Sequence, residues 1–471
     1  MLRLEQEIKK LGFFWLPSLP ENKIAGNITI SDGGNIELET VGSFYGFLDE
    51  LKKGLDNDNN LGRVLGNIEE YGLVTLERCF YKNKNISFDG ISKSKIHVGK
   101  ALLGVAYDED HIILINNFRF SIEGIDEWIN INGIDIKHSV DKEKVLIKYT
   151  PPKEIKIYIN KKISLSIVFS WSFPSYPVIS EARVVQKTYF EIKSENREDI
   201  EHFTSIAYKI ANLLSFAIDK TVCLREISFT SSTINQNPME IKFNPKRILL
   251  FYPSLPHVKE KSKIYQKNML FIFELIKDNP EKVIKKWFEA YETISPALNL
   301  YFSAKVGAHK YQDGKFLALA QGIETYSRRT IDEKRLTNEN FNILVNSLID
   351  KCPEEHKKWL HGRLKHGNEI NLSKRIKIAI EPFKEILGNS KEREKMIRSI
   401  VDTRNYLTHY DPELKEKAAT SGTQLYLLCL KMEAIFQLNI LNMLGFSKNE
   451  IILIIKKNNN LRRKIKEGIS I

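Results

Sequence analysis

The sequence Val401-Asp402-Thr403-Arg404-Asn405-Tyr406-Leu407-Thr408-His409-Tyr410-Asp411-Pro412 predicts both a helix and a pair of functional side chains near its end. Apolar residues at helical spacing run through and just before it, namely Ile397, Ile400, Val401 and Leu407. On a helix that turns about 100° per residue these side chains form one stripe, and Arg404 falls in its middle. A guanidinium in an apolar stripe predicts an ion pair, an interface or a bound anion, because an unpaired buried charge is costly.

His409 follows Arg404 by five residues, which places it about 140° away around an ideal helix. Asp411-Pro412 ends the helix, because the residue before a proline avoids helical geometry. We therefore expect the last turn to bring the His409 imidazole round toward Arg404. Asn405 lies one turn before His409 and on the same side of the helix.

The rest of the C-terminal part, residues 256–471, is predicted to be helical. Pro, Gly and capping residues punctuate helices expected over 264–277, from Pro280, over 316–329, over 353–367, over 373–387 and over 424–444. Asn389 and Glu392 have the spacing of a capping box at the start of the helix that carries Arg404. This order of elements predicts a helical bundle.

The N-terminal part, residues 1–255, is predicted to be β-rich. Ile28 and Ile30 alternate with polar residues, Asp32-Gly33-Gly34-Asn35 supplies a turn, and residues 36–39 alternate again, which indicates a hairpin. Further strand-like segments, spaced as in a sandwich or barrel, are 145–149, 155–159, 163–171, 222–229 and 239–252. One long helix is expected near 197–219. The predicted fold class is α+β and multidomain.

The composition is that of a globular chain with a basic C-terminal part. The 471 residues are enough for two or three domains, with 42% hydrophobic and 28% charged residues. The net charge of +12 is concentrated late in the chain, since residues 281–471 contain 34 basic and 23 acidic side chains. This asymmetry favours a polyanion such as RNA as the partner of the C-terminal part, and a solvated Lys-rich surface would produce the same charge.

Several classes of protein are disfavoured by the sequence. The most apolar long segment, 425–444, contains Lys, Glu, Gln and Asn, so we expect no membrane span, and the acidic N-terminus does not resemble a signal peptide. We therefore expect a cytoplasmic protein. The chain contains no P-loop, no GxGxxG, no HExxH, no GxSxG and no recognisable set of metal ligands, so we expect neither a metal nor another cofactor.

The segment Arg404-Asn405-Tyr406-Leu407-Thr408-His409 resembles the R-x4-6-H motif of the HEPN superfamily, with a polar residue directly after the arginine. A β-rich region followed by a HEPN bundle is similar to the Apea-like family of bacterial anti-phage proteins, over most of the chain. This resemblance implies a metal-independent endoribonuclease with Arg404 and His409 as catalytic residues and Asn405 as a substrate-binding or orienting residue. It also implies a homodimer, an abortive-infection role against host RNA such as tRNA, and an N-terminal sensor of a phage-derived trigger.

The chemistry that the motif implies is available to these residue types. The 2′-hydroxyl of RNA attacks the adjacent phosphate when a base takes its proton and a cation stabilises the charged phosphorane. His409 suits the proton transfer, because an imidazole can accept and donate a proton near neutral pH, and Arg404 suits the phosphate oxygens. The alternative is a non-catalytic HEPN module that binds RNA or a partner protein.

Other charged residues have simpler interpretations. Glu324 is expected to be the buried partner of an arginine within the bundle. The basic stretch between His361 and His366 is expected to be a solvated face, although it could contact phosphate. Arg197 and His202 repeat the spacing of Arg404 and His409, but the apolar stripe of their helix lies away from both, so we expect a solvated helix start.

Overall fold

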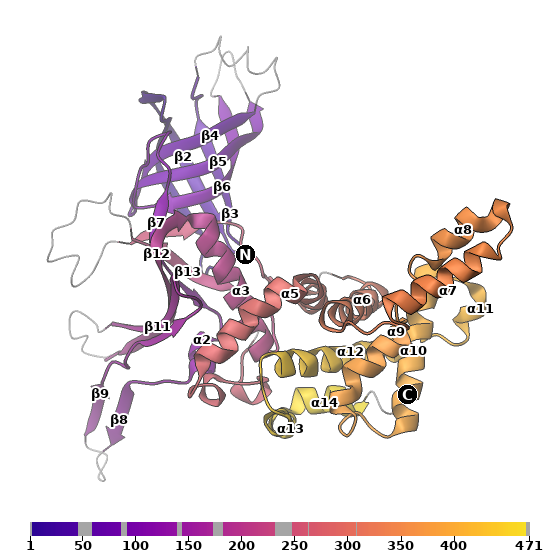
Figure 1. Cartoon of the computed structure of the whole chain (residues 1–471). Coiled ribbons are helices and arrows are strands. Elements are labelled where there is room, and N and C mark those ends of the chain that lie inside the picture. Colours follow the sequence, from indigo (N-terminus) through magenta and orange to yellow (C-terminus); the bar gives the residue numbers. More distant parts are fainter. Residues whose placement is uncertain are drawn as a thin grey trace. The chain divides into compact units, whose positions relative to one another are not determined.

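The computed structural model describes residues 2–45, 59–85, 92–138, 144–172, 182–230, 247–261, 263–307 and 309–467. The chain divides into two compact units, Met1–Lys285 and Lys286–Ile471, which we call the β-rich unit and the helical unit. Figure 1 shows the strands in the first unit and helices throughout the second. The predicted order, a β-rich region followed by a helical bundle, is confirmed.

The boundary between the units lies at Lys285 rather than at residue 255. The Trp128 indole N–H donates to the carbonyl of Phe271 at 3.0 Å, and the Leu270 amide donates to the carbonyl of Ala217 at 2.7 Å. The helix predicted over 264–277 is wrong: only two 3-10 turns form, η1 (Gln266–Asn268) and η2 (Phe273–Leu275). These tertiary contacts tie the segment to the β-rich unit, which overrides its helical spacing.

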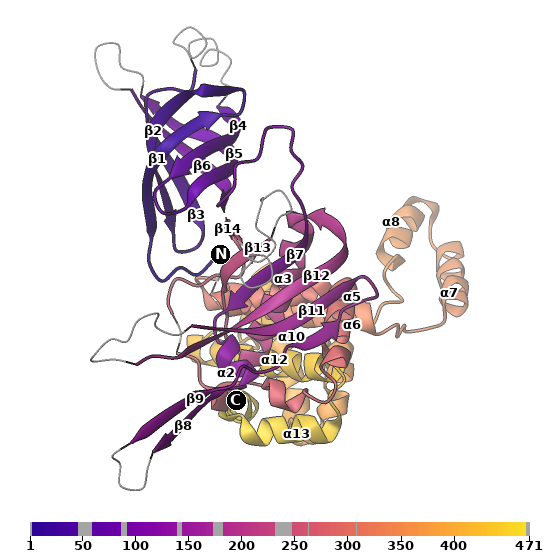
Figure 2. The same cartoon turned by 90° about the vertical axis from the view of Figure 1, so that its left-hand side faces the viewer.

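Six antiparallel strands of the β-rich unit close into a barrel, because β5 pairs with both β4 and β6 (Figure 2). They are β1 (Ile8–Leu16), β2 (Leu19–Ser31), β3 (Asn35–Val41), β4 (Asn60–Ile68), β5 (Gly72–Asn85) and β6 (Lys93–Leu103). The predicted hairpin forms, with Ile30 opposite Ile36. Its turn contains Gly33 and Gly34, whose φ angles of 98° and 71° suit glycine.

The sheet continues from β6 beyond the barrel, in the order β14-β13-β7-β12-β11-β10. These strands are β7 (Leu114–Ile122), β10 (Ile155–Tyr158), β11 (Ile163–Ser172), β12 (Val185–Asp199), β13 (Leu224–Phe229) and β14 (Ile248–Phe251). The short helix α2 (Ile125–Ile129) follows β7, and the predicted long helix is α3 (Ile200–Ile218). α3 packs on β7 and β12, with the rings of Phe203 and Phe118 stacked at 5.8 Å. Of the strand predicted over 239–252, residues 239–246 lie outside the described residues.

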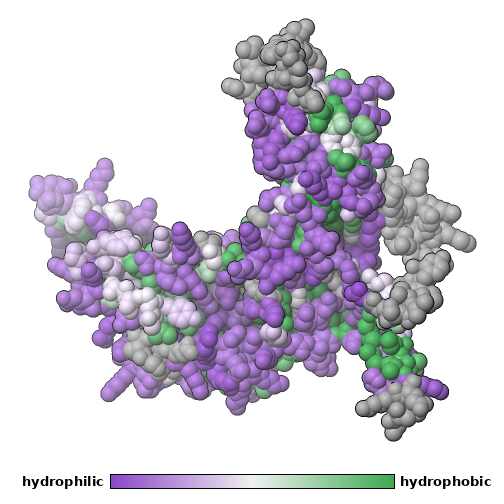
Figure 3. Space-filling model, turned by 180° about the vertical axis from the view of Figure 1, so that it is seen from behind, coloured by the Kyte–Doolittle hydropathy of each residue, from purple (hydrophilic) through white to green (hydrophobic). Residues whose placement is uncertain are grey.

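A separate two-stranded hairpin consists of β8 (Ile134–His138) and β9 (Val145–Tyr149). Ile136 pairs with Ile147 on one of its faces, and both side chains are exposed. Val145 and Leu146 are exposed as well. Figure 3 shows the resulting hydrophobic patch on this hairpin, and other hydrophobic areas are visible on the same face, including one on the barrel.

The helical unit contains most of α5 and all later helices. Their bounds are α5 (Pro280–Val306), α6 (Gln312–Thr330), α7 (Asn338–Asp350), α8 (Glu354–Leu364), α9 (Leu372–Ile380), η3 (Glu381–Phe383), α10 (Ser390–His409), α11 (Pro412–Lys415), α12 (Gly422–Met443), α13 (Lys448–Lys457) and α14 (Asn459–Glu467). Pro280 opens α5, as predicted, and Gly388 and Gly445 take positive φ angles between helices.

Helix α12 is the core of the helical unit, and it contacts α6, α9, α13 and α14. By length and composition alone it could cross a membrane, but 83% of its apolar window is buried inside the protein. Its buried residues include Lys431, Glu433, Gln437 and Asn439, each of which contacts another polar group of the unit. The helix therefore packs on other helices around most of its circumference.

Candidate active site on helix α10

Helix α10 begins at the predicted capping box. The Asn389 side chain accepts a hydrogen bond from the Glu392 amide at 3.0 Å, and the Glu392 carboxylate accepts one from the Asn389 amide at 2.7 Å. The helix remains regular through His409 and ends at Tyr410, which has a left-handed backbone (φ 51°). Asp411 then caps the short helix α11, whose first residue is Pro412. Local sequence signals thus set both ends of α10.

The buried face of α10 differs in detail from the predicted stripe. It consists of Met396, Ile397, Ile400, Thr403 and Leu407. Thr403 is fully buried, and its hydroxyl accepts a hydrogen bond from the Ala419 amide at 2.9 Å. The Arg404 side chain is 35% exposed, so it lies at the edge of the buried face rather than in its middle. This position gives the guanidinium access to both protein partners and solvent.

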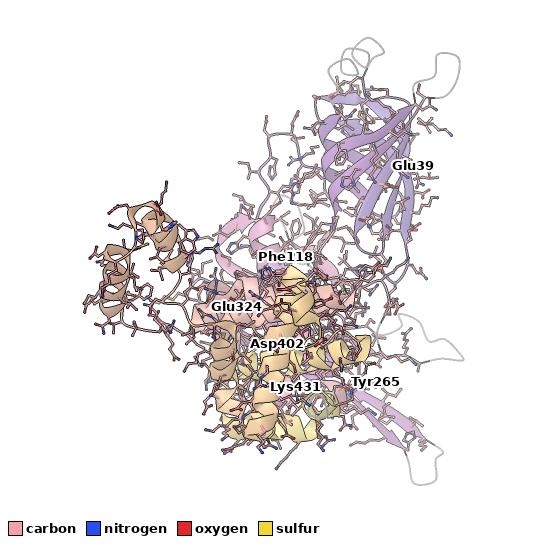
Figure 4. The ribbon with its side chains drawn as sticks, turned by 90° about the vertical axis from the view of Figure 1, so that its right-hand side faces the viewer. Glu39, Phe118, Tyr265, Glu324, Asp402 and Lys431 are labelled. Carbon is pink, nitrogen blue, oxygen red and sulfur yellow. The ribbon has the colours of Figure 1, made fainter. Side chains whose placement is uncertain are left out.

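The Arg404 guanidinium has two partners in the helical unit. Its Nη2 donates to Oε2 of Glu324 on α6 at 3.4 Å, and its Nη1 donates to Oδ1 of Asn405 at 3.2 Å. α6 and α10 pack against each other, and Figure 4 marks Glu324 on α6 and Asp402 on α10. The expectation that Glu324 pairs with an arginine of the bundle is confirmed. The Asn405 amide oxygen thus contacts one terminal nitrogen of the guanidinium.

His409 is exposed at the last turn of α10, and its ring forms no hydrogen bond or ion pair with any residue that the structure describes. Because the helix stays regular to its end, His409 stays about 140° around the axis and about 7.5 Å along it from Arg404. Contrary to our expectation, no contact between the imidazole and the guanidinium occurs among the described residues. Within one chain the structure joins Arg404 to Asn405 but does not join either residue to His409.

A chain of ion pairs extends from Arg404 through Glu324. Oε1 of Glu324 accepts from Arg328 Nη2 at 3.0 Å, and Arg328 also pairs with Glu369. Oε1 of Glu369 lies 2.9 Å from Nδ1 of His366. The Arg328 contact, followed by that of His366, holds the pKa of the Glu369 carboxyl below its usual value. The sequence analysis singled out Arg404, Glu324 and His366 but neither Arg328 nor Glu369, although Arg328, four residues after Glu324 on the same helix, was a usable signal.

The second Arg/His pair of the sequence has a different setting. Arg197 lies in strand β12 and His202 lies in the first turn of α3, so the two residues do not share a helix. The His202 amide is instead capped by the Asp199 carboxylate at 2.7 Å. Equal spacing in sequence therefore corresponds to two different local structures.

No group of three or more His, Cys, Asp or Glu side chains that could hold a metal occurs among the described residues. The site residues on α10 are consequently an arginine, an amide and an imidazole, together with a carboxylate from α6. These groups can bind an anion and transfer a proton.

Comparison with known protein families agrees with this architecture. Residues 9–287 match the model for ApeA N-terminal domain 1, and residues 317–450 match the model for the Apea-like HEPN domain. The first match covers more than half of the chain and nearly the whole β-rich unit, and the second includes α10 with Arg404 and His409. No curated protein and no solved structure gives a significant match. The chain belongs to the Apea-like HEPN family.

Proposed function

We propose that this protein is a metal-independent endoribonuclease of the HEPN type. In this reaction His409 takes the proton of an RNA 2′-hydroxyl, which attacks the neighbouring phosphate, and Arg404 stabilises the charge that develops on the phosphate oxygens. Asn405 orients the guanidinium through its hydrogen bond to Nη1. The 5′-oxygen then leaves with a proton, and the products carry a 2′,3′-cyclic phosphate and a 5′-hydroxyl.

The exposure and contacts of Arg404 and His409 are the observation that supports this proposal. An arginine side chain has five N–H donors, and the contacts with Glu324 and Asn405 use one on each terminal nitrogen. The remaining donors and the 35% exposed surface leave room for phosphate oxygens. The imidazole of His409 is exposed beyond the last turn of the same helix, where a substrate can reach it.

The separation of these two side chains supports a composite site in a homodimer. Positions 404 and 409 lie about 140° apart around an ideal helix, and no contact between the two side chains occurs among the described residues, which favours a second copy of α10 as the source of the other group. Two copies of α10 that meet around a twofold axis would each supply one Arg404 and one His409 to a shared cleft. Two imidazoles would also provide for the two proton transfers that the reaction needs.

The family membership supports a role in defence against phage. We propose that the helical unit cleaves host RNA, with tRNA as the leading candidate, and so halts growth in an infected cell. The β-rich unit then senses a phage-derived trigger, and the protein acts in the cytoplasm. Physical separation of the two units along the chain would suit a sensor and an effector, because each has its own core.

Incubation of the purified full chain with RNA in the presence of EDTA tests the mechanism. We expect cleavage to continue with chelator, to leave 2′,3′-cyclic phosphate and 5′-hydroxyl ends, and to spare DNA of the same sequence, which lacks the nucleophile. Cleavage that stops with EDTA, returns with magnesium and leaves 5′-phosphate ends would refute the mechanism.

The Arg404–Glu324 ion pair also favours a second candidate, in which the site is structural and the domain only binds RNA or protein. In that case the wild-type chain would bind RNA without cleaving it, and Arg404→Ala would lower the free energy of unfolding without changing any reaction. Parallel measurement of cleavage, RNA binding and unfolding for this variant separates the two candidates.

A further inference from the structure

Residues 331–370 form a helical hairpin, which we call the arm. Its helices α7 and α8, both fully described, contain no buried residue. The connecting segments pair at its base, where Lys334 and Glu369 form a β-bridge and the Arg335 amide donates to the Asn368 carbonyl at 2.9 Å. In Figures 1 and 2 the arm stands out from α9, α10 and α12 of the same unit. Its outer surfaces are therefore available to a partner.

The outer face of α8 presents an exposed aromatic ring between a histidine and an arginine. Trp359 is 62% exposed. His356 three residues before it and Arg363 four residues after it lie on the same face of the helix. Between them stands Gly362, where a Cβ atom would meet nothing within 4 Å. The side of the indole is thus open, and a flat group can approach it.

The charge of α8 and its flanks fits a polyanion. Residues 351–366 contain five Lys or Arg and two Asp or Glu, which gives +3, and three histidines besides. Both acidic residues have partners within this segment, Glu354 with Lys357 and Glu355 with His356. Such a basic surface attracts phosphate groups. An apolar protein partner would bury the same charges without supplying opposite charges.

The base of the arm connects to the candidate catalytic arginine. His366, just beyond α8, contacts Glu369, which pairs with Arg328. Arg328 and Arg404 each pair with one carboxylate oxygen of Glu324. Three side chains, Glu369, Arg328 and Glu324, thus connect His366 at the end of the arm to Arg404 in the candidate active site.

We propose that the arm is an RNA-binding element, in which an unpaired base stacks on Trp359 and Arg363 contacts the adjacent phosphate. Aromatic rings flanked by cations bind single-stranded RNA, because every base has a π-face and every nucleotide a charge. This inference rests on the proposed function for its substrate. It adds that the arm selects unpaired nucleotides, such as those of an exposed loop, before the strand reaches Arg404.

The test measures binding of a short fluorescein-labelled single-stranded RNA to the full chain by anisotropy, in EDTA and in the His409→Ala background so that the RNA stays intact. We expect Trp359→Ala to weaken binding about tenfold, as for loss of one stacked base, and Trp359→Phe to keep most of the affinity. The matched control is Leu344→Ala, which removes an exposed side chain from α7 of the same arm and should leave binding unchanged.

Each outcome decides one proposal. Equal binding by Trp359→Ala and the parent would overturn the arm inference, even if the wild-type chain cleaves RNA. Weakened binding by Trp359→Ala together with a wild-type chain that never cleaves RNA would keep the arm inference and overturn the nuclease. A change of oligomeric state in Leu344→Ala with no effect at Trp359 would show instead that the arm docks protein.

Discussion

The barrel and helix α12 are cores of opposite chemical character. The inward side chains of the barrel are almost all apolar, such as Phe14, Ile28 and Leu38, each of which is fully buried. Helix α12 instead buries Lys431 and Glu433 among its apolar residues. The barrel thus depends on closure of its strands, and the helical unit depends on matching specific polar partners between helices.

Glu433 shows how that matching works. Its carboxylate is 4% exposed and lies near the amino groups of Lys315 at 2.8 Å, Lys464 at 3.2 Å and Lys305 at 3.7 Å, from three other helices. Burial alone would raise the pKa of Glu433, but the three lysines lower it to about 2. Buried ion pairs add little net stability, but loss of one partner is strongly destabilising. The arrangement therefore fixes which helices pack together.

The largest expected effect is a loss of RNA cleavage, and it compares the two Arg/His pairs, one in each unit. We expect His409→Ala to lower RNA cleavage by a factor of about 100 to 10,000, the usual contribution of a general acid or base. His202→Ala in the β-rich unit is the matched control and should cleave like the wild type. Similar losses in both variants would mean that the motif on α10 has no special role.

A mixture of variants tests whether the site is composite. Homodimers of Arg404→Ala and of His409→Ala should both be inactive, whereas a mixed dimer keeps one intact Arg404 and one intact His409 in its shared cleft. We expect partial recovery of cleavage on mixing, measured with the same RNA substrate. Full activity of a wild-type chain that is shown to be a monomer at the assay concentration would contradict the composite site.

Local sequence signals were sufficient to predict the start and the end of the helix that carries the candidate site. The capping box at Asn389 and the end of α10 at His409 were predicted because both depend on neighbouring residues. The boundary at Lys285 was not, because the contact of Trp128 with Phe271 joins residues far apart in sequence. Closure of the barrel rather than a sandwich depends on the register between β5 and β6, which alternating patterns do not specify.

The sequence predicted which residues form the candidate site but not how their side chains are arranged. The pairing of Glu324 with an arginine followed from its place among apolar residues, but the partner, 80 residues away, depends on how α6 and α10 pack. The expected movement of His409 toward Arg404 was wrong, because α10 keeps helical geometry up to His409 before Tyr410 turns the chain. The catalytic roles of Arg404, Asn405 and His409 remain predictions.

The second largest effect concerns the polar core of the helical unit. Glu433→Gln leaves three lysines around a neutral amide, and we expect it to lower the free energy of unfolding by about 3 kcal/mol at pH 7. The carboxylate contributes fully above pH 4.5, its unfolded pKa, and its contribution falls as the pH drops toward about 2. The difference between wild type and variant, measured by denaturant unfolding, should therefore shrink across this window.

The control for that experiment is Glu385→Gln, which removes an exposed carboxylate paired with Lys448. We expect little change in unfolding, because solvent screens surface ion pairs. A difference for Glu433→Gln that stays constant from pH 7 to pH 3 would show that the lysines do not stabilise the ionised carboxylate.

A smaller effect is expected at the carboxylate that holds Arg404. Glu324→Gln keeps the shape of the side chain but removes its charge, and we expect cleavage to fall about tenfold, equivalent to about 1.4 kcal/mol. RNA binding and the free energy of unfolding should change much less. Faster cleavage by this variant would mean that Glu324 restrains Arg404 by competing with the phosphate, rather than positioning it.

The smallest expected effect concerns the barrel. It tests whether an apolar side chain in the barrel core raises the free energy of unfolding. Thr40 is 2% exposed, and its hydroxyl has no hydrogen-bond partner among the described residues, so Thr40→Val should raise the free energy of unfolding by about 1 kcal/mol without affecting cleavage. The matched variant is Thr75→Val, because the Thr75 hydroxyl donates to the Val105 carbonyl at 2.9 Å and accepts from the Tyr107 amide at 3.0 Å. We expect that variant to lose about 1–3 kcal/mol. Equal losses in both variants, measured by denaturant unfolding, would mean that the Thr40 hydroxyl is satisfied in solution by water in the cavity of about 860 Å³ that it lines.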